Sequence, residues 1–120
     1  MSLSIDDIRA AADRLKGHVE RTPCRLSKTL SDITGAEVWV KFENQQFTAA
    51  YKERGALNKL MQLTDAEKGR GVIAASAGNL ALALAYHGKR LGIPVTVVMP
   101  VHAPLIKQAR CRSIGAEDIL

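Results

Sequence analysis

Apolar residues recur at helical spacing in several parts of the chain. Between Ser4 and Gly17 this repeat follows a polar pair, Ser4 and Asp7, that is spaced as a capping box, so the pattern predicts an amphipathic helix. Glycine is a frequent helix stop, which explains the end expected at Gly17. Further helices are predicted at 27–33, from Lys52 onward, at 80–91, and from Pro104 onward.

Short runs of apolar and β-branched residues predict strands between these helices. They lie at 37–42, 71–75 and 94–99. The order strand, turn, helix, strand within about 30 residues has the dimensions of a βαβ unit. We therefore expect an α/β fold with an open parallel sheet covered by helices. The last apolar pair, Ile119–Leu120, is too short to complete a strand, so we expect the chain to stop within an element.

Length and composition favour one soluble globular unit. A chain of 120 residues can bury a core, and no linker-like tract or internal repeat divides it. The N-terminus lacks the pattern of a signal peptide, and no apolar run approaches the roughly 20 residues that span a bilayer. Cys24 and Cys111 lie far apart, without the spacing of a metal site. We expect a cytoplasmic chain that binds neither membrane nor metal.

The formal charge of +5 raises the question of a nucleic-acid partner. However, the basic residues are scattered, and aromatic residues make up only 4% of the chain, which leaves few side chains for base stacking. No G-x-G-x-x-G loop is present that would indicate a nucleotide site. We therefore expect a mildly basic, solvated surface and no nucleic-acid partner.

Two loops are candidate ligand sites, because ligands of parallel sheets bind beyond the carboxyl ends of the strands. One loop runs from Phe42 to Lys52, and the other from Ser76 to Asn79. In the second loop a glycine and the free amides of a helix start could bind a carboxylate, or Ser76 and Asn79 could simply cap the helix. Lys52 at a helix start is either a lysine used as an amine or an ordinary surface lysine.

The segment from Lys41 to Ala56 resembles the cofactor-lysine motif of pyridoxal-phosphate-dependent threonine and serine dehydratases, K-x-E-N-x-Q-x-T-G-S-F-K-x-R-G-A. The segment Ser76-Ala77-Gly78-Asn79 is similar to the S-A-G-N loop of the same family. The resemblance covers nearly the whole chain and implies the N-terminal portion and small domain of the fold type II enzymes. It places residues 1–42 with the large domain of the family and 43–120 with the small domain.

The resemblance implies a role for each matching residue. Lys52 would carry pyridoxal 5'-phosphate and later accept the substrate α-proton, Tyr51 would lie near the cofactor ring, and Asn79 would hydrogen-bond its 3-oxygen. Ser76, Ala77, Gly78 and Asn79 would bind the substrate. The implied reaction converts L-threonine or L-serine, the small-molecule partner, into a 2-oxo acid and ammonia. Ala77, where related racemases have a serine, favours elimination over racemisation.

Several departures from the family pattern favour an alternative. Leu80 and Leu82 stand where the family has polar residues, and Ala50 replaces a serine. No glycine-rich phosphate cradle occurs in the 120 residues, so we expect this chain by itself to bind the cofactor weakly or not at all. The alternative is a truncated or degenerate relative without catalysis, which associates with another chain through a sheet edge at Leu120; a second copy of the same chain, giving a homo-oligomer, is one such partner.

Overall fold

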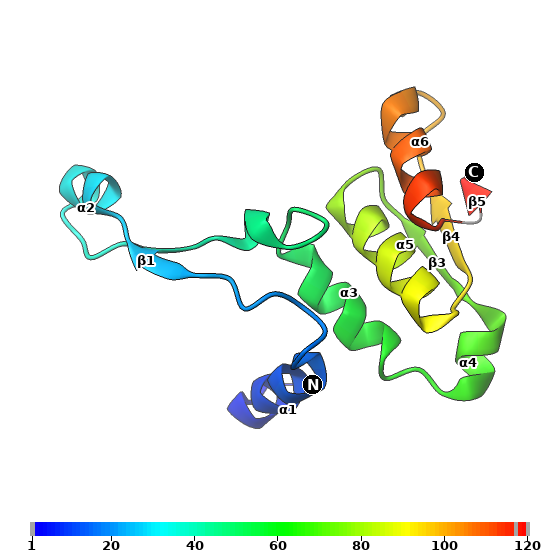
Figure 1. Ribbon diagram of the computed structural model, residues 1–120, viewed down its shortest axis with the longest axis horizontal. Helices are drawn as coiled ribbons and strands as arrows, with labels where there is room; N and C mark the ends of the chain where they lie inside the picture. The colour runs from blue at the N-terminus through cyan, green and yellow to red at the C-terminus, as the bar shows by residue number, and fades with distance from the viewer. Residues whose placement is uncertain (1, 117, 120) are drawn as a thin grey trace.

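A computed structural model describes residues 2–116 and 118–119 of the chain. The elements are α1 (Ile5–Leu15), β1 (Cys24–Leu26), α2 (Lys28–Thr34), β2 (Trp39–Lys41), the 3-10 helix η1 (Glu43–Gln45), α3 (Lys52–Leu60), α4 (Asp65–Arg70), β3 (Val72–Ala75), α5 (Asn79–Leu91), β4 (Val95–Val98), α6 (Leu105–Ile114) and β5 (Asp118–Ile119). In Figure 1 the elements from α3 onward form one packed unit, and the segment that holds β1 and α2 extends away from it.

The strands β3, β4 and β5 form a parallel sheet in that order, which confirms the predicted α/β fold. The units β3–α5–β4 and β4–α6–β5 place α5 and α6 against the same side of β3 and β4 (Figure 1). Side chains alternate along each strand: Val95 and Val97 are fully buried, whereas Ile73 is 69% exposed. Among residues 2–116 and 118–119, helices therefore pack on one face of the sheet rather than on both (Figure 1).

The core lies between the sheet and the helices α3, α5 and α6. α5 contributes a fully buried alanine face and two nearly buried leucines, and α3 adds Ala56 and Leu60. Gly88 allows the close approach of α5 to the sheet, because a Cβ at this position would collide with the Val95 side chain and lie 2.9 Å from the Ile93 carbonyl oxygen. Small residues on α5 thus set the distance between helix and sheet.

In the N-terminal part the two predicted helices are present, whereas the strand predicted at 37–42 pairs differently from our expectation. α1 has the expected capping box between Ser4 and Asp7, and α2 begins after Ser27 and ends at Gly35, whose φ is +70°. The strand expected at 37–42 is shorter, and it pairs antiparallel with β1 instead of joining the parallel sheet. The Phe42–Lys52 loop therefore does not follow a strand of that sheet, as we had expected. The reason is local, because α2 turns the chain back so that β1 is the nearest partner.

α4 was not predicted, although its start carries a readable signal. Thr64 and Glu67 form a capping box, with both the Thr64 amide and hydroxyl donating to the Glu67 carboxylate. At the other end of the chain, β5 pairs with β4 through Asp118 and Ile119. The expectation about an open edge at Leu120 lies outside the described residues.

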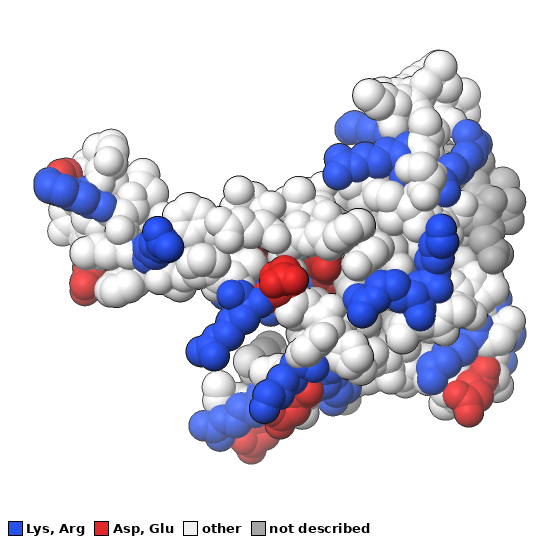
Figure 2. All heavy atoms as spheres, in the orientation of Figure 1, with Lys and Arg blue, Asp and Glu red and all other residues white. Residues whose placement is uncertain are grey.

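On the side seen in Figure 2, charged side chains of one sign do not gather into a single large patch. Lys and Arg side chains form several separate groups there, and acidic side chains accompany some of them. Within the described residues, no helix is both long and apolar enough to cross a membrane.

Candidate active site

Lys52 is the first residue of α3, and its side chain is exposed. Its ammonium group lies 5.4 Å from the centre of the Tyr51 ring, which is itself 63% exposed. A cation at a helix start is opposed by the helix dipole, and a neighbouring aromatic face is one of the few favourable contacts available to it. The structure thus presents an accessible amine beside an accessible aromatic ring.

An ion pair anchors the loop that leads to Lys52. Arg54 donates to both oxygens of the Glu43 carboxylate at 2.8 Å and to the Glu20 carbonyl at 3.0 Å. Thr22 also donates to Glu43, from a buried side chain. The hydrogen bonds from Arg54 lower the pKa of Glu43 to about 2. Because these partners come from three segments, they fix the loop between the N-terminal part and α3.

The turn directly before Lys52 contains a left-handed residue. Ala49 has φ of +60°, a value that costs an alanine more than a glycine. The dehydratase motif has glycine at this position, so the substitution places a side chain where the motif has none. On either side of Ala49 in the sequence, Thr48 and Glu53 are joined by two hydrogen bonds of 2.7 Å.

The Ser76–Asn79 loop leads from β3 into α5. The Ser76 hydroxyl accepts a hydrogen bond from the Gly78 amide at 3.2 Å, and Gly78 is the N-cap of α5 without a side-chain cap hydrogen bond. Of the two readings left open by the sequence, the turn closed by Ser76 is therefore present, but within the described residues neither Ser76 nor Asn79 accepts a hydrogen bond from an amide of α5 itself. The first amides of α5 need an acceptor from elsewhere, as the free ends of helices do.

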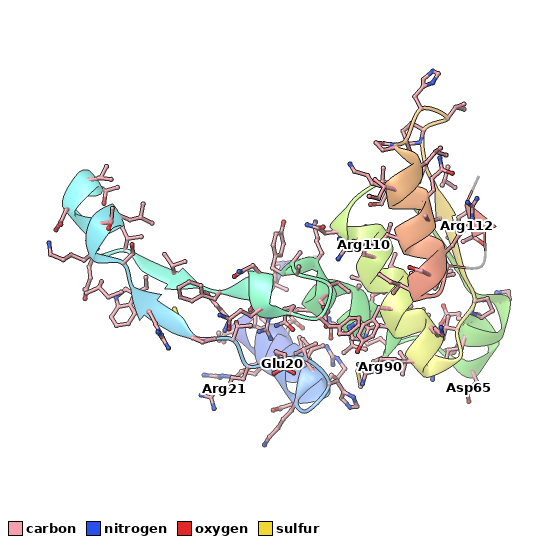
Figure 3. The ribbon with its side chains drawn as sticks, turned by 45° about the horizontal axis from the view of Figure 1, so that its top comes forward. Glu20, Arg21, Asp65, Arg90, Arg110 and Arg112 are labelled. Carbon is pink, nitrogen blue, oxygen red and sulfur yellow. The ribbon has the colours of Figure 1, made fainter. Side chains whose placement is uncertain are left out.

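A cavity of about 170 Å³ lies next to this loop. Its lining residues are Ala77, Gly78, Asn79, Leu82, Lys107, Arg110 and Cys111. Arg110 projects from α6 toward the first turns of α5 (Figure 3), so two basic side chains and a helix start share the cavity. Burial raises the pKa of the Cys111 thiol, which keeps this group protonated rather than nucleophilic.

The structure brings the proposed residues together in two groups. Tyr51 and Lys52 form one group at the start of α3, and the Ser76–Asn79 loop forms the other at the start of α5. The two helices pack on each other, and both begin on the side of the pair that faces away from α4 (Figure 1).

The exposed donors at these two helix starts fit the chemistry of pyridoxal phosphate. Lys52 provides a primary amine for the aldehyde, Tyr51 an aromatic face for the ring, and Asn79 an uncharged amide that can donate to a phenolic oxygen. Asn79 and Lys52 both have exposed side chains, which leaves them accessible to a ligand.

Sequence reasoning missed the residues that support Lys52. Glu43 and Arg54 belong to the motif that we matched, but spacing alone did not show that they form an ion pair. Glu53 was missed altogether, because a charged residue next to a surface lysine normally indicates exposure, whereas its side chain is only 3% exposed. The glycine in the matched motif was the available signal for the left-handed backbone at Ala49.

Comparison with known proteins places these features in a family. The sequence model of the family described as pyridoxal-phosphate dependent enzyme matches residues 15–120. L-threonine ammonia-lyase of Thermotoga maritima is 46% identical over 118 residues, which cover 98% of this chain and 29% of that protein. The catabolic L-threonine dehydratase TdcB of Staphylococcus aureus is 47% identical over 119 residues, which cover 98% of this chain and 34% of that protein.

A solved structure agrees with the sequence comparisons. Maize serine racemase superposes with a TM-score of 0.88 and 35% identity, over 99% of this chain and 36% of that one. The chain therefore spans about a third of the length of its relatives. Since the family model matches from the last residue of α1 to the end of the chain and the fold agrees with that of a relative, this chain belongs to the family of pyridoxal-phosphate-dependent enzymes.

Proposed function

We propose that this chain carries the cofactor lysine and the substrate loop of a dehydratase that converts L-threonine or L-serine into a 2-oxo acid and ammonia. The observation that carries the proposal is the exposed amine of Lys52 at the start of α3, beside the Tyr51 ring, in a chain 46% identical to an L-threonine ammonia-lyase. As in the family pattern, residues 1–42 would belong with a large domain and 43–120 with a small one.

Each residue of the two helix starts has a proposed task. Lys52 would bond the cofactor through Nζ; once the substrate amine has displaced it from the cofactor, the freed Nζ would accept the substrate α-proton. Tyr51 would lie against the ring, and Asn79 would donate a hydrogen bond to its phenolic oxygen. When bound, pyridoxal phosphate supplies an electron sink for negative charge at the substrate α-carbon.

The Ser76–Asn79 loop would bind the substrate carboxylate. The adjoining cavity is electropositive, as an anion site requires. The backbone donors at the start of α5 and the basic side chains of Lys107 and Arg110 contribute this positive charge. Ala77 has no group that transfers protons, which supports elimination rather than racemisation.

A non-catalytic relative is the second candidate, and one observation favours it. Leu82, which is 8% exposed, lines the cavity beside Asn79 and makes part of its wall apolar. Such a chain would keep the fold while binding cofactor poorly.

The absorbance spectrum of the chain mixed with pyridoxal phosphate tests the proposal. We expect a band near the visible region that is lost in Lys52→Ala. The matched control is Lys28→Ala, because Lys28 is also exposed and also opens a helix, α2, in the N-terminal segment. Loss of the band in Lys52→Ala but not in Lys28→Ala, together with 2-oxo acid formed from threonine, would support the dehydratase. Equal bands in both variants would contradict a specific role for Lys52, and a specific band without 2-oxo acid would favour the non-catalytic relative.

A further inference from the structure

Glu53 is a buried carboxylate next to Lys52 in the sequence. Its Oε2 accepts hydrogen bonds from both the amide and the hydroxyl of Thr48, each at 2.7 Å, and both side chains are almost completely buried. Burying a carboxylate is costly unless its oxygens are satisfied, so these two bonds are necessary for Glu53 to occupy this position.

The second oxygen of Glu53 faces His87 of α5. Oε1 lies 3.4 Å from Nε2 of His87, whose ring is fully buried. On the opposite side of the ring, Nδ1 lies 3.3 Å from the guanidinium of Arg90, which has donors alone, so Nδ1 is assigned as the acceptor and Nε2 as the protonated nitrogen. Burial lowers the pKa of His87, which keeps the ring neutral. Nε2 makes no hydrogen bond within the described residues, so Glu53 reaches α5 through this close contact alone and thereby places the turn before Lys52 against that helix.

The same turn contains the strained residue Ala49. A left-handed alanine is less stable than a left-handed glycine by roughly 1 kcal/mol, and such strain persists where surrounding contacts hold the backbone. The Thr48–Glu53 bonds enclose Ala49, and the Ala49 amide donates to the Gln46 carbonyl at 2.8 Å. Neither Thr48 nor Glu53 can move without releasing the turn between them.

We propose that Glu53 is a positioning residue that holds the left-handed turn at Ala49, through Thr48 and His87, and so fixes Lys52 at the start of α3. The expected effect on cofactor binding by Lys52 rests on the proposed function. The expected effect on the stability of the backbone turn at Ala49 does not.

Hydrogen exchange of the Thr48 amide tests the proposal in the chain itself, without cofactor. Glu53→Gln keeps the shape of the side chain but removes its charge, and it turns an amide NH2 toward the protonated Nε2 of His87. We expect the Thr48 amide to exchange about tenfold faster, because hydrogen bonds to charged acceptors are stronger than those to neutral ones. The Val72 amide, which donates to the Pro94 carbonyl, should keep its exchange rate and so report that the fold is intact.

The matched control is Glu67→Gln in α4. Glu67 accepts from the amide and hydroxyl of Thr64 just as Glu53 does from Thr48, but in an exposed capping box. This variant should leave exchange at Thr48 unchanged. If Glu53→Gln does not fold, Thr48→Val removes the hydroxyl donor with little change of shape, and the amide of residue 48 should again exchange faster.

Rescue by Ala49→Gly distinguishes positioning from a general loss of stability. Glycine relieves the strain that Glu53 is proposed to hold, so Glu53→Gln with Ala49→Gly should regain most of the lost protection at Thr48.

The Lys52-dependent absorbance band should form about fivefold more slowly in Glu53→Gln and recover in the double variant. Unchanged exchange in Glu53→Gln, or no rescue, would overturn the proposal. Absence of the band in the parent chain would instead contradict the role of Lys52 and leave the exchange result to decide on Glu53.

Discussion

Single residues on both sides of Lys52 show how strongly this turn departs from an ordinary surface loop. Glu53 and Thr48 are buried although both are polar, and Ala49 is left-handed although it is not a glycine. Each feature is unfavourable alone, and they are compatible because the carboxylate satisfies two donors and closes the turn around Ala49.

Glu43 makes the free energy of unfolding of the chain depend on pH. Its pKa in the folded chain is about 2, below its ordinary value of 4.5, so its contribution is complete above pH 4.5 and is lost as the pH falls toward 2. The full shift corresponds to roughly 3 kcal/mol, and solvent at Arg54, whose side chain is 30% exposed, reduces this to about 1–2 kcal/mol. Urea unfolding at several pH values measures the loss.

Two variants check that Glu43 is responsible. Between pH 4.5 and pH 2 the free energy of unfolding should fall by about 1–2 kcal/mol less in Glu43→Gln than in the parent chain. Glu37 is exposed in the same N-terminal segment, so in Glu37→Gln the free energy of unfolding should fall with pH as much as in the parent chain. An equal decline in Glu43→Gln and the parent would show that other groups govern acid unfolding.

At the scale of elements, local signals located most helices, and packing decided their neighbours. The polar pair at Ser4 and Asp7 and the glycine at Gly35 mark helix ends through bonds within a few residues, so they can be read from the sequence. The strand around Trp39 could be recognised, but its partner could not, because pairing depends on where α2 returns the chain.

The contact between α5 and β4 predicts the effect of a single methyl group. Gly88→Ala should lower the free energy of unfolding by about 1–3 kcal/mol, since the new Cβ would collide with Val95 and must displace the helix from the sheet. Gly69→Ala is the control, because a Cβ at Gly69 in α4 meets open space and improves helix propensity. Denaturant unfolding should show a loss for Gly88→Ala and no loss for Gly69→Ala; similar values for both would contradict close packing at Gly88.

The whole molecule is more extended than a compact domain of its length. Its radius of gyration is 16.6 Å, against roughly 14 Å expected for 120 residues. The difference comes from the segment with β1, α2 and β2, in which every residue is exposed or half-buried, including Trp39 at 58% exposure. Arg90, labelled in Figure 3, lies where α5 meets the chain before this segment, because it donates to the His18 carbonyl.

This shape predicts the order of proteolysis. Trypsin should cut after Arg25 and Lys28 at least about tenfold faster than after Lys59, because few buried contacts oppose local opening of β1 and α2, whereas α3 is held by Leu57 and Leu60. Mass spectrometry of the first fragments identifies the sites, and Arg25→Gln with Lys28→Gln should abolish the cuts at these two positions. First cuts within α3 would contradict the stability of the packed unit.

The sequence by itself determined most helix ends, the βαβ order, the family and the choice of Lys52 and Asn79 as candidates, because caps, periodicity and motifs act over short distances along the chain. The tertiary structure alone decided that β2 pairs outside the parallel sheet, that the described helices pack on one face of that sheet, and that Glu53 is buried against Thr48 and His87. Those outcomes depend on contacts between segments far apart in sequence, such as α3 and α5, whose packing determines which polar groups are buried and which bonds satisfy them.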